Sequence, residues 1–376
     1  MKHALLFVAA FTAAVNGYAQ TGKPIFIGEV APLTGPAATV GVRLNKTSKM
    51  WAEELNAKGG INGRKIELVT CNDEGRPDKA AACVRDFQEK GAVIIFANSL
   101  TASLRAMQPL VKNGPILLIP SPNAVPPADS YAFQVSPSDL HLTQAIAKYM
   151  RESHVDKIGM IAATDASGEV GVENATKVFS DQKIELRLAR MDLRATDAST
   201  QLARVAGPDI KLVYSSYTGA GAVSVVKSFK ILGLPQALMV SYGNMSDAFV
   251  SLIKDVAPAR LLGTSIVALL PDEMPKGAAR ERARTFLDAY AKRYSEKADM
   301  INLLGKAETD VAEAVLRTPN PSDYAAVKKF LESTPIESIH TQKFSPTNHV
   351  GLDASSVMIV ELKDGGWFKA QALTGR

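Results

Sequence analysis

The sequence has few cysteine and histidine residues, and this limits the kinds of site that it can build. Only Cys71 and Cys83 occur among 376 residues, together with five histidines. A structural metal site needs several Cys or His ligands at close spacing, which this dispersed set does not provide. We therefore expect neither a metal site nor a cofactor.

The sequence also lacks the short motifs of the common enzyme classes. It contains no GxSxG nucleophile elbow, no HExxH helix and no Walker lysine. Gly219-Ala220-Gly221 resembles part of a dinucleotide loop, but no third glycine follows at the required spacing. We expect that the protein is not an enzyme.

Charge of one sign is not concentrated in any part of the chain. Lys and Arg number 43, Asp and Glu number 38, and the net charge is +5. Basic residues are interspersed with acidic ones, as at Glu281 within residues 280–284, and no basic stripe is interleaved with aromatic residues. Nucleic acid is therefore not an expected partner.

Long apolar runs are absent except at the N-terminus. Lys2 is followed by the apolar segment 4–15 and then by Gly17-Tyr18-Ala19, the layout of a secretory signal peptide. We predict that residues 1–19 are a signal peptide, with cleavage after Ala19 and a mature protein in the periplasm. In an exported chain, Cys71 and Cys83, which flank a strand-to-helix turn, are interpreted as a disulfide.

Apolar strands alternate with amphipathic helices over the first part of the chain. The strands lack polar alternation, which is typical of a parallel sheet covered by helices on both faces. The segment IFIGEVAPLTGPAATVG, residues 25–41, reads as a strand, a loop and the start of a helix. The first module is predicted to contain strands at 25–27, 64–70, 92–96 and 116–119, and helices at 39–57, 78–90 and 101–112.

A second module of the same kind follows residues 133–137. After it, a strand at 261–269 precedes two long helices, at 278–294 and 302–317, which we expect to return and cover the first module. Short strands are expected at 342–344, 357–362 and 367–370. The second module is predicted to contain helices at 139–152, 168–180, 197–206, 219–232 and 245–254, and strands at 157–163, 183–190, 210–215 and 237–241.

Four segments of the first module carry a resemblance to a known family. They are GEVAPLTGPAATVG, KGGINGRKIELVTCNDEG (58–75), the helix start PDKAAA and the strand-turn ILLIPSPNA. Together they resemble the periplasmic leucine/isoleucine/valine-binding proteins, type I solute receptors that serve ABC importers. The turn Gly59-Gly60-Ile61-Asn62-Gly63-Arg64, with Asp73-Glu74 a strand later, is the most specific part of the match.

The resemblance implies two Rossmann-like α/β lobes with parallel central sheets, joined by a hinge of three crossovers. Lobe I would comprise 24–136 plus 269–340, and lobe II 137–268 plus 341–376. It also implies a monomeric receptor that closes around a small amino-acid-like, amide or carboxylate ligand, aromatic or aliphatic, and then contacts ABC permease subunits. A ligand-sensing module for signalling is the alternative function for the same fold.

The resemblance also implies ligand contacts at the loops that follow the strands. Ser, Thr and Asn at these loops also fit as helix caps or turn residues, and each Tyr fits as a packed core residue. The expected ligand-binding residues are Val40, Asn98, Ser99, Thr101, Ser121 and Asn123 in lobe I, and Ser167, Tyr217 and Tyr242 in lobe II.

One position departs from the amino-acid-binding members of the family. Where they place an acidic residue for the ligand ammonium, this chain has Tyr242-Gly243. Because a buried ammonium without a counter-charge is costly, we hypothesise a ligand that lacks an ammonium. Asp165 and Glu169, on another loop of lobe II, remain candidates to replace the missing acid.

Overall fold

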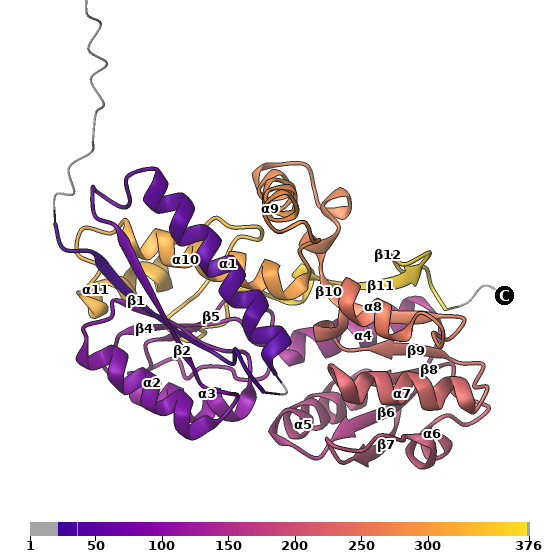
Figure 1. Ribbon diagram of the computed structural model, residues 1–376. Helices are drawn as coiled ribbons and strands as arrows, with labels where there is room; N and C mark the ends of the chain where they lie inside the picture. The colour runs from indigo at the N-terminus through magenta and orange to yellow at the C-terminus, as the bar shows by residue number, and fades with distance from the viewer. Residues whose placement is uncertain (1–21, 36, 374–376) are drawn as a thin grey trace, which may run out of the picture.

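The computed structural model describes residues 22–35 and 37–373. They form two α/β lobes that lie side by side (Figure 1). The predicted signal peptide, residues 1–19, lies outside the described residues. Among the helices in the described part of the chain, none is long and apolar enough to cross a membrane.

The first lobe is built on a five-stranded parallel sheet in the order β2-β1-β3-β4-β5. Helices from both ends of the chain surround it (Figure 1). The strands are β1 (Ile25–Ala31), β2 (Ile66–Asn72), β3 (Ile94–Phe96), β4 (Ile116–Ile119) and β5 (Ala132–Gln134). The helices of this part are α1 (Ala38–Ala57), α2 (Pro77–Glu89), α3 (Thr101–Met107), the 3-10 turn η1 (Gln108–Val111), α9 (Ala278–Tyr294), α10 (Met300–Leu316) and α11 (Tyr324–Ser333).

The second lobe holds a seven-stranded sheet in the order β12-β11-β10-β9-β8-β6-β7, in which only the β10–β11 and β11–β12 pairs are antiparallel. The strands are β6 (Lys157–Ala163), β7 (Glu185–Met191), β8 (Leu212–Ser215), β9 (Ala237–Val240), β10 (Leu261–Ile266), β11 (Val357–Lys363) and β12 (Gly366–Lys369). The helices are α4 (Asp139–Glu152), α5 (Ala166–Asp181), α6 (Ser199–Val205), α7 (Ala220–Ile231) and α8 (Asp247–Ile253), with 3-10 turns η2 (Tyr242–Asn244), η3 (Val267–Leu269), η4 (Pro271–Glu273) and η5 (Ala354–Ser356).

The chain passes between the lobes three times, after β5, after β10 and before β11. The helices after the second crossing pack on the first lobe, as predicted. In α10, the Asn302 side chain donates to the Arg43 carbonyl of α1 at 3.1 Å. The indole N–H of Trp51 donates to Glu313 at 3.3 Å. The two-lobe fold with three crossovers is therefore confirmed.

The third crossing lies further along the chain than predicted. Residues 341–376 were assigned to lobe II, but residues 342–351 lie against β5 of lobe I. The backbone N–H of Gln134 donates to the His349 carbonyl at 2.8 Å, and the Gln342 side chain donates to the Val135 carbonyl at 3.0 Å. This segment forms hydrogen bonds with the backbone at the edge of the first sheet. Residues 342–351 therefore belong with lobe I, and the boundary between the lobes lies after them rather than at 340/341.

Two elements were missed, and one predicted strand is not formed. Strand β5 has three residues and α11 follows a Pro-rich turn, so both patterns are too short or too irregular to recognise. The predicted strand at 342–344 contributes only an isolated bridge, between Ile336 and Gln342. Long-range pairing, which a local pattern does not record, decides the two strand outcomes.

Local sequence signals explain where several helices begin. Pro77 occupies the first turn of α2, where its missing N–H costs nothing. At the start of α4 the Ser138 side chain accepts from the His141 backbone while His141 Nδ1 accepts from the Ser138 backbone. The first N–H groups of a helix have no partner within the helix. Ser138 and His141 accept hydrogen bonds from such groups, and Pro77 has no N–H to pair, so these residues determine where the two helices begin.

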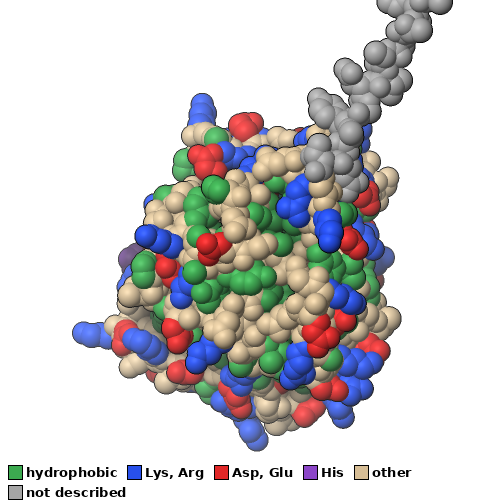
Figure 2. Space-filling model, turned by 90° about the vertical axis from the view of Figure 1, so that its left-hand side faces the viewer, with side chains coloured by type: hydrophobic (Ala, Val, Ile, Leu, Met, Phe, Trp, Pro, Cys, Tyr) green, Lys and Arg blue, Asp and Glu red, His purple; other side chains and the backbone are tan. Residues whose placement is uncertain are grey.

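The surface at the end of the first lobe carries both signs of charge. Figure 2 shows basic and acidic side chains interspersed over this face, with apolar side chains between them. Neither sign forms a continuous patch on the face shown. The mixture agrees with the scattered charges of the sequence.

Cys71 on β2 and Cys83 on α2 form a disulfide, with their Cα atoms 6.0 Å apart. The bond joins the edge strand of the first sheet to the helix that follows it. Cys83 is buried among Val84, Phe87 and other core residues. The disulfide therefore limits the freedom of this strand-turn-helix unit in the unfolded chain.

We predict that replacing both cysteines by serine lowers the free energy of unfolding by about 3 kcal/mol, because the closed loop is of moderate length. Guanidinium unfolding of the mature protein measures this change. A thiol reductant should lower the stability of the wild type and leave the double variant unaffected. Equal stability of the two proteins without reductant would contradict the prediction.

Glu29 and Glu308 are two of the buried carboxyl groups inside the first lobe. Glu29 on β1 accepts hydrogen bonds from the side chains of Asn45, Ser48 and Thr70. Burial raises the pKa of Glu29 despite these donors. Burial, reinforced by the nearby Glu29, raises the pKa of Glu308 on α10 well above its usual value, and Glu308 Oε1 has no hydrogen-bond partner among the residues that the structure describes.

The Glu308→Gln variant tests the state of this pair. A carboxyl whose folded pKa is raised stabilises the fold fully below its unfolded pKa, and this stability is lost as pH rises through the folded pKa. In the wild type the free energy of unfolding should fall as the pH rises from about 5 to about 8. In Glu308→Gln this fall should be smaller, and the difference between the two proteins should be about 1.4 kcal/mol for each unit by which folding raises the pKa of Glu308. Chemical unfolding at each pH measures it.

Exposed Glu54 on α1 provides the matched control. Its replacement by glutamine should leave the pH dependence of unfolding as in the wild type. A Glu308→Gln variant with the same pH dependence as the wild type would show that Glu308 is ionised in the folded protein.

Candidate ligand-binding site

The two lobes meet at the ends of β4 and β9. Ser121 follows β4 by two residues, is fully buried, and donates from its hydroxyl to the Ser99 carbonyl at 3.0 Å. The Ser121 side chain also lies near the Tyr242 hydroxyl of the second lobe, and its effect is to lower the pKa of that hydroxyl. Burial and the nearby Asp139 carboxylate raise the pKa of Tyr242. The structure thus brings two of the predicted site residues together across the lobes.

The loop after β3 is organised by its own hydrogen bonds. Asn98 is fully buried, donates to Asp73 Oδ2 at 2.5 Å and accepts from the Leu100 backbone at 2.9 Å. Its side chain is therefore used inside lobe I and orients the loop. Ser99 offers its carbonyl to Ser121, and Thr101, which is buried, begins α3.

Burial raises the pKa of Asp73, and hydrogen bonds from the Gly75 backbone and from the side chains of Ser103 and Asn98 oppose the shift. Asp73, which follows β2, therefore anchors the loop after β3 from the far side of β1. Asn123 lies two residues beyond Ser121 in the turn after β4 and is partly buried. Val40 lies in the first turn of α1 and is also partly buried.

The loop after β6 uses its polar side chains to cap α5. Asp165 Oδ1 accepts from the Gly168 backbone at 2.9 Å and from the Ser167 hydroxyl at 2.8 Å. Ser167, a predicted contact, is therefore engaged within its own loop. Glu169 is exposed and lies 3.8 Å from Arg105 of α3, across the two lobes. Asp165 is thus occupied as a cap, and Glu169 lies on the rim.

Tyr217 does not lie with the other predicted site residues. Its side chain is 2% exposed and belongs to the apolar core of the second lobe. Its hydroxyl donates to the Met191 carbonyl, in the same lobe. The packed-tyrosine interpretation therefore describes Tyr217 in this structure, and its contact with a ligand stays a prediction.

The sequence analysis missed an acidic residue at the junction. Asp139 is the first residue of α4, immediately after the first crossing, and its backbone N–H donates to the Pro122 carbonyl of lobe I at 3.0 Å. Asp139 Oδ2 accepts from the Asn174 side chain at 2.9 Å. Burial raises the pKa of Asp139. In the sequence, Ser138-Asp139 follows a strand and precedes a helix. This pattern is also that of an ordinary helix cap, so it did not indicate a residue at the lobe junction.

Two buried hydroxyls flank the tyrosines of this junction. Ser215 ends β8 directly after Tyr214, and Ser241 directly precedes Tyr242. They are 0% and 4% exposed, and neither hydroxyl has a hydrogen-bond partner within the described residues. Burial, and then the charge of Asp139, raise the pKa of Tyr214. The carboxyl ends of β8 and β9 therefore each carry a buried hydroxyl whose hydrogen-bonding capacity is unused within the described residues.

A groove of about 550 Å³ runs along one side of the lobe junction. Arg43 of α1 crosses it, donating to the Ser246 hydroxyl of the second lobe at 3.3 Å and pairing with Asp299 at 3.0 Å. Lys297 lies 3.8 Å from Asp247. The groove is lined by the first half of α1, the start of α8 and the connection between α9 and α10.

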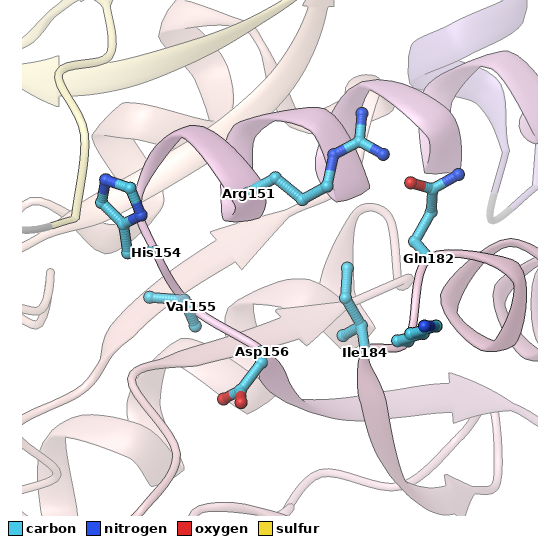
Figure 3. A pocket seen from close by; sticks show the side chains of 7 residues that line it. Arg151, His154, Val155, Asp156, Gln182 and Ile184 are labelled. Carbon is cyan, nitrogen blue, oxygen red and sulfur yellow. The ribbon is translucent and has the colours of Figure 1, made fainter.

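A second pocket, of about 280 Å³, lies at the opposite end of the second sheet (Figure 3). Arg151, His154 and Gln182 are among the side chains around it. These residues lie near the amino ends of β6 and β7, away from the lobe junction. None of the predicted ligand contacts lines this pocket. The described residues also contain no group of three or more His, Cys, Asp or Glu side chains placed to hold a metal ion.

The family model described as periplasmic binding protein matches residues 24–366. The chain belongs to the periplasmic binding protein family. The predicted relationship to the leucine/isoleucine/valine-binding proteins is confirmed by the named relatives below. Family membership supports a ligand-binding receptor, which is the broad form of the predicted function.

Two characterised relatives bear leucine/isoleucine/valine-binding names. This periplasmic binding protein is 20% identical over 357 residues to the leucine-, isoleucine-, valine-, threonine- and alanine-binding protein of Pseudomonas aeruginosa, covering 93% of this chain and 91% of that protein. It is 26% identical over 182 residues to Leu/Ile/Val-binding protein homolog 3 of Brucella melitensis, covering 47% of this chain and 49% of that protein. The match thus spans about half the length of the Brucella relative.

A solved structure shares the fold. It is an ABC transporter solute-binding protein of Rhodopseudomonas palustris in complex with benzoate, with a TM-score of 0.77 and 18% identity. The match covers 93% of this chain and 96% of that chain. At this identity the similarity shows the two-lobed fold.

We predict that removing the hydroxyl of Tyr242 or Ser121, as Tyr242→Phe or Ser121→Ala, favours a more open arrangement of the lobes. A polar contact between these two hydroxyls would contribute about 1 kcal/mol, a roughly fivefold change in the ratio of closed to open forms. Small-angle scattering should report a larger radius of gyration in both variants.

Tyr217→Phe is the matched control, since its hydroxyl binds within one lobe. This variant should lower the melting temperature and leave the radius of gyration as in the wild type. An unchanged radius in both Tyr242→Phe and Ser121→Ala would rule out the interlobe role of this pair.

Proposed function

We propose that this protein is an extracytoplasmic solute-binding receptor of an ABC importer, which binds a small amino-acid-like or carboxylate ligand between its lobes. The observation that carries the proposal is the approach of Ser121 and Tyr242, one from each lobe, which is seen in the effect of Ser121 on the pKa of Tyr242. It joins the carboxyl ends of β4 and β9, and ligands of open α/β sheets bind at such ends. A ligand that contacts both residues would favour the closed form.

The proposed mechanism is a hinge equilibrium that the ligand shifts. A ligand changes such an equilibrium only by its difference in affinity for the two forms. Two ion pairs across the lobes, Arg105 with Glu169 and Lys297 with Asp247, are exposed and 3.8 Å apart. Exposed pairs of this kind contribute little in water. The Arg43 side chain also donates to the Ser246 hydroxyl across the lobes at 3.3 Å. Contacts of the ligand with both lobes would add to the closing free energy.

The structure narrows the set of proposed contacts. Asn98 and Ser167 bind inside their own loops, and Tyr217 lies in a core. Val40 stays a candidate wall residue at the start of α1. The side chains proposed to contact the ligand directly are Ser99, Thr101, Ser121, Asn123 and Tyr242.

Two kinds of ligand are supported by the comparisons. The Pseudomonas relative is named for binding leucine, isoleucine, valine, threonine and alanine, and the Rhodopseudomonas structure contains benzoate. Together with the predicted signal peptide, these relatives support a periplasmic receptor that delivers its ligand to a membrane permease. The chain is proposed to act as a monomer.

A thermal-shift screen of the mature protein, beginning at Gln20, tests the proposal. The panel comprises amino acids, amides, and aliphatic and aromatic carboxylates. A ligand at 100 times its dissociation constant should add about 2.7 kcal/mol and raise the melting temperature visibly. The Tyr242→Phe variant should show a smaller shift with the same compound. If no compound of the panel stabilises the wild type, the proposed function is wrong.

A further inference from the structure

We propose that Asn72 and Asp73 are positioning residues of the ligand site, whose side chains hold the two loops of lobe I that lead to the junction with lobe II. The first loop comprises residues 32–35, after β1, and the second comprises residues 97–100, after β3. The inference rests on the proposed function, because it assumes a ligand between the lobes. Neither residue is proposed to contact the ligand itself.

Asn72 is the last residue of β2, the edge strand of the first sheet, and its side-chain amide binds the first loop. Its Oδ1 accepts from the Leu33 backbone N–H at 2.9 Å, and its Nδ2 donates to the Thr34 hydroxyl at 2.9 Å. Oδ1 also accepts from the Glu74 backbone N–H at 3.1 Å. The amide therefore uses its donor and its acceptor together to hold the first loop at the end of β2.

Asp73 directly follows β2 and is fully buried. Its carboxylate binds the second loop, on the far side of β1. Oδ2 accepts from the Asn98 side chain at 2.5 Å and from the Ser103 hydroxyl, in α3, at 3.4 Å. The Asn98 side chain in turn accepts from the Leu100 backbone N–H at 2.9 Å. Side-chain hydrogen bonds therefore connect the end of β2 to the second loop.

The turn after Asp73 also packs between the two loops. A Cβ at Gly75 would lie 3.2 Å from the Leu100 side chain and 3.8 Å from Ala37, at the start of α1. A Cβ at Gly35, in the first loop, would lie 3.1 Å from the Glu74 carbonyl oxygen. The turn thus touches both loops at close range, which is an observation independent of the hydrogen bonds.

Both loops lead into helices that contact lobe II. Arg43 of α1 donates to the Ser246 hydroxyl at 3.3 Å. Arg105 of α3 lies 3.8 Å from Glu169. A displacement of either loop would therefore move a helix that meets the other lobe.

The second loop also carries proposed ligand contacts. Ser99 lies between Asn98 and Leu100, which are joined by a hydrogen bond, and Thr101 begins α3. The Ser99 carbonyl accepts from Ser121 at 3.0 Å. Groups that contact a ligand bind it well only when other hydrogen bonds hold them in the correct place. The bonds from the end of β2 have this arrangement.

The alternative is a purely local role in the turn after β2. Asn72 and Asp73 do accept from the Glu74 and Gly75 backbones within that turn. However, the disulfide already ties β2 to α2 across the same turn. The other four hydrogen bonds of the two side chains join residues 25 to 39 positions away in the sequence. A local role would not require these long-range partners.

Hydrogen exchange of backbone amides, followed by NMR on the mature protein, tests the positioning without a ligand. In Asn72→Ala the Leu33 amide should exchange about fivefold faster than in the wild type, because its acceptor is removed. In Asp73→Ala the Leu100 amide should exchange faster by a similar factor, and the Leu33 amide should be less affected. Asp73→Asn keeps an acceptor for Asn98 and should restore part of the protection of Leu100.

Calorimetry with leucine and benzoate relates this positioning to binding. The two probes represent the two kinds of ligand that the comparisons support. For the probe that the wild type binds more tightly, Asn72→Ala and Asp73→Ala should each bind about 10-fold more weakly. Asp73→Asn should recover part of the affinity. A role in stability alone would lower the melting temperature and leave the affinity of the folded protein unchanged.

Asp323→Ala is the matched control. The Asp323 carboxylate also accepts from a backbone N–H of lobe I, that of Ala326 in α11, at 3.0 Å. The neighbouring Tyr324 donates to the Ala92 carbonyl, just before β3, so this cap lies at the opposite end of that strand from the second loop. Asp323→Ala should lower the melting temperature and leave both the affinity and the exchange in the two loops as in the wild type.

The outcomes distinguish the inference from the proposed function. Unchanged exchange at Leu33 in Asn72→Ala and at Leu100 in Asp73→Ala would overturn the inference. Wild-type affinity in both variants would overturn it as well, and the receptor function would stand. If no compound of the broader panel binds the wild type, the proposed function and the inference both fail. If an alanine variant does not fold, Thr34→Val or Asp73→Asn replaces it, with a smaller effect of the same sign.

Discussion

Parallel pairing within each sheet is the constraint on which the site depends. Because β1, β3 and β4 run in the same direction, their ends lie at one edge of the first sheet, and β6, β8 and β9 do the same in the second. The three crossings turn these edges toward each other. Ser121 and Tyr242 belong to segments 121 residues apart, yet both follow strand ends, and the fold alone brings them into contact.

Much of this arrangement could be predicted from the sequence. Apolar strands without polar alternation indicated parallel sheets, and the family motifs indicated two lobes and the loops that face each other. The sequence did not predict the direction in which individual side chains point. Tyr217 and Tyr242 each follow a strand end by two residues, but one hydroxyl turns into the core and the other reaches the opposite lobe. A difference in backbone path after the strand, which composition does not reveal, separates them.

The remaining errors come from contacts between distant parts of the chain. Residues 342–351 pair with the edge at β5, more than 200 residues earlier, so their lobe could not be read from local pattern. Asp139 was overlooked for a related reason. In the sequence Ser138-Asp139 is a helix start, and only the approach of Asn174, Tyr214 and Tyr242 makes it a polar centre.

The carboxyl groups inside the molecule differ in the number of hydrogen bonds that they accept. This number separates carboxyl groups that stabilise one lobe from carboxyl groups with capacity to bind another group. Glu29 accepts three side-chain hydrogen bonds within one lobe, so opening of the lobes leaves its surroundings unchanged. Asp139 has one such donor and lies between the lobes. Asp139 begins α4 directly after the first crossing, so its surroundings include groups of both lobes, and any movement of the lobes acts on them.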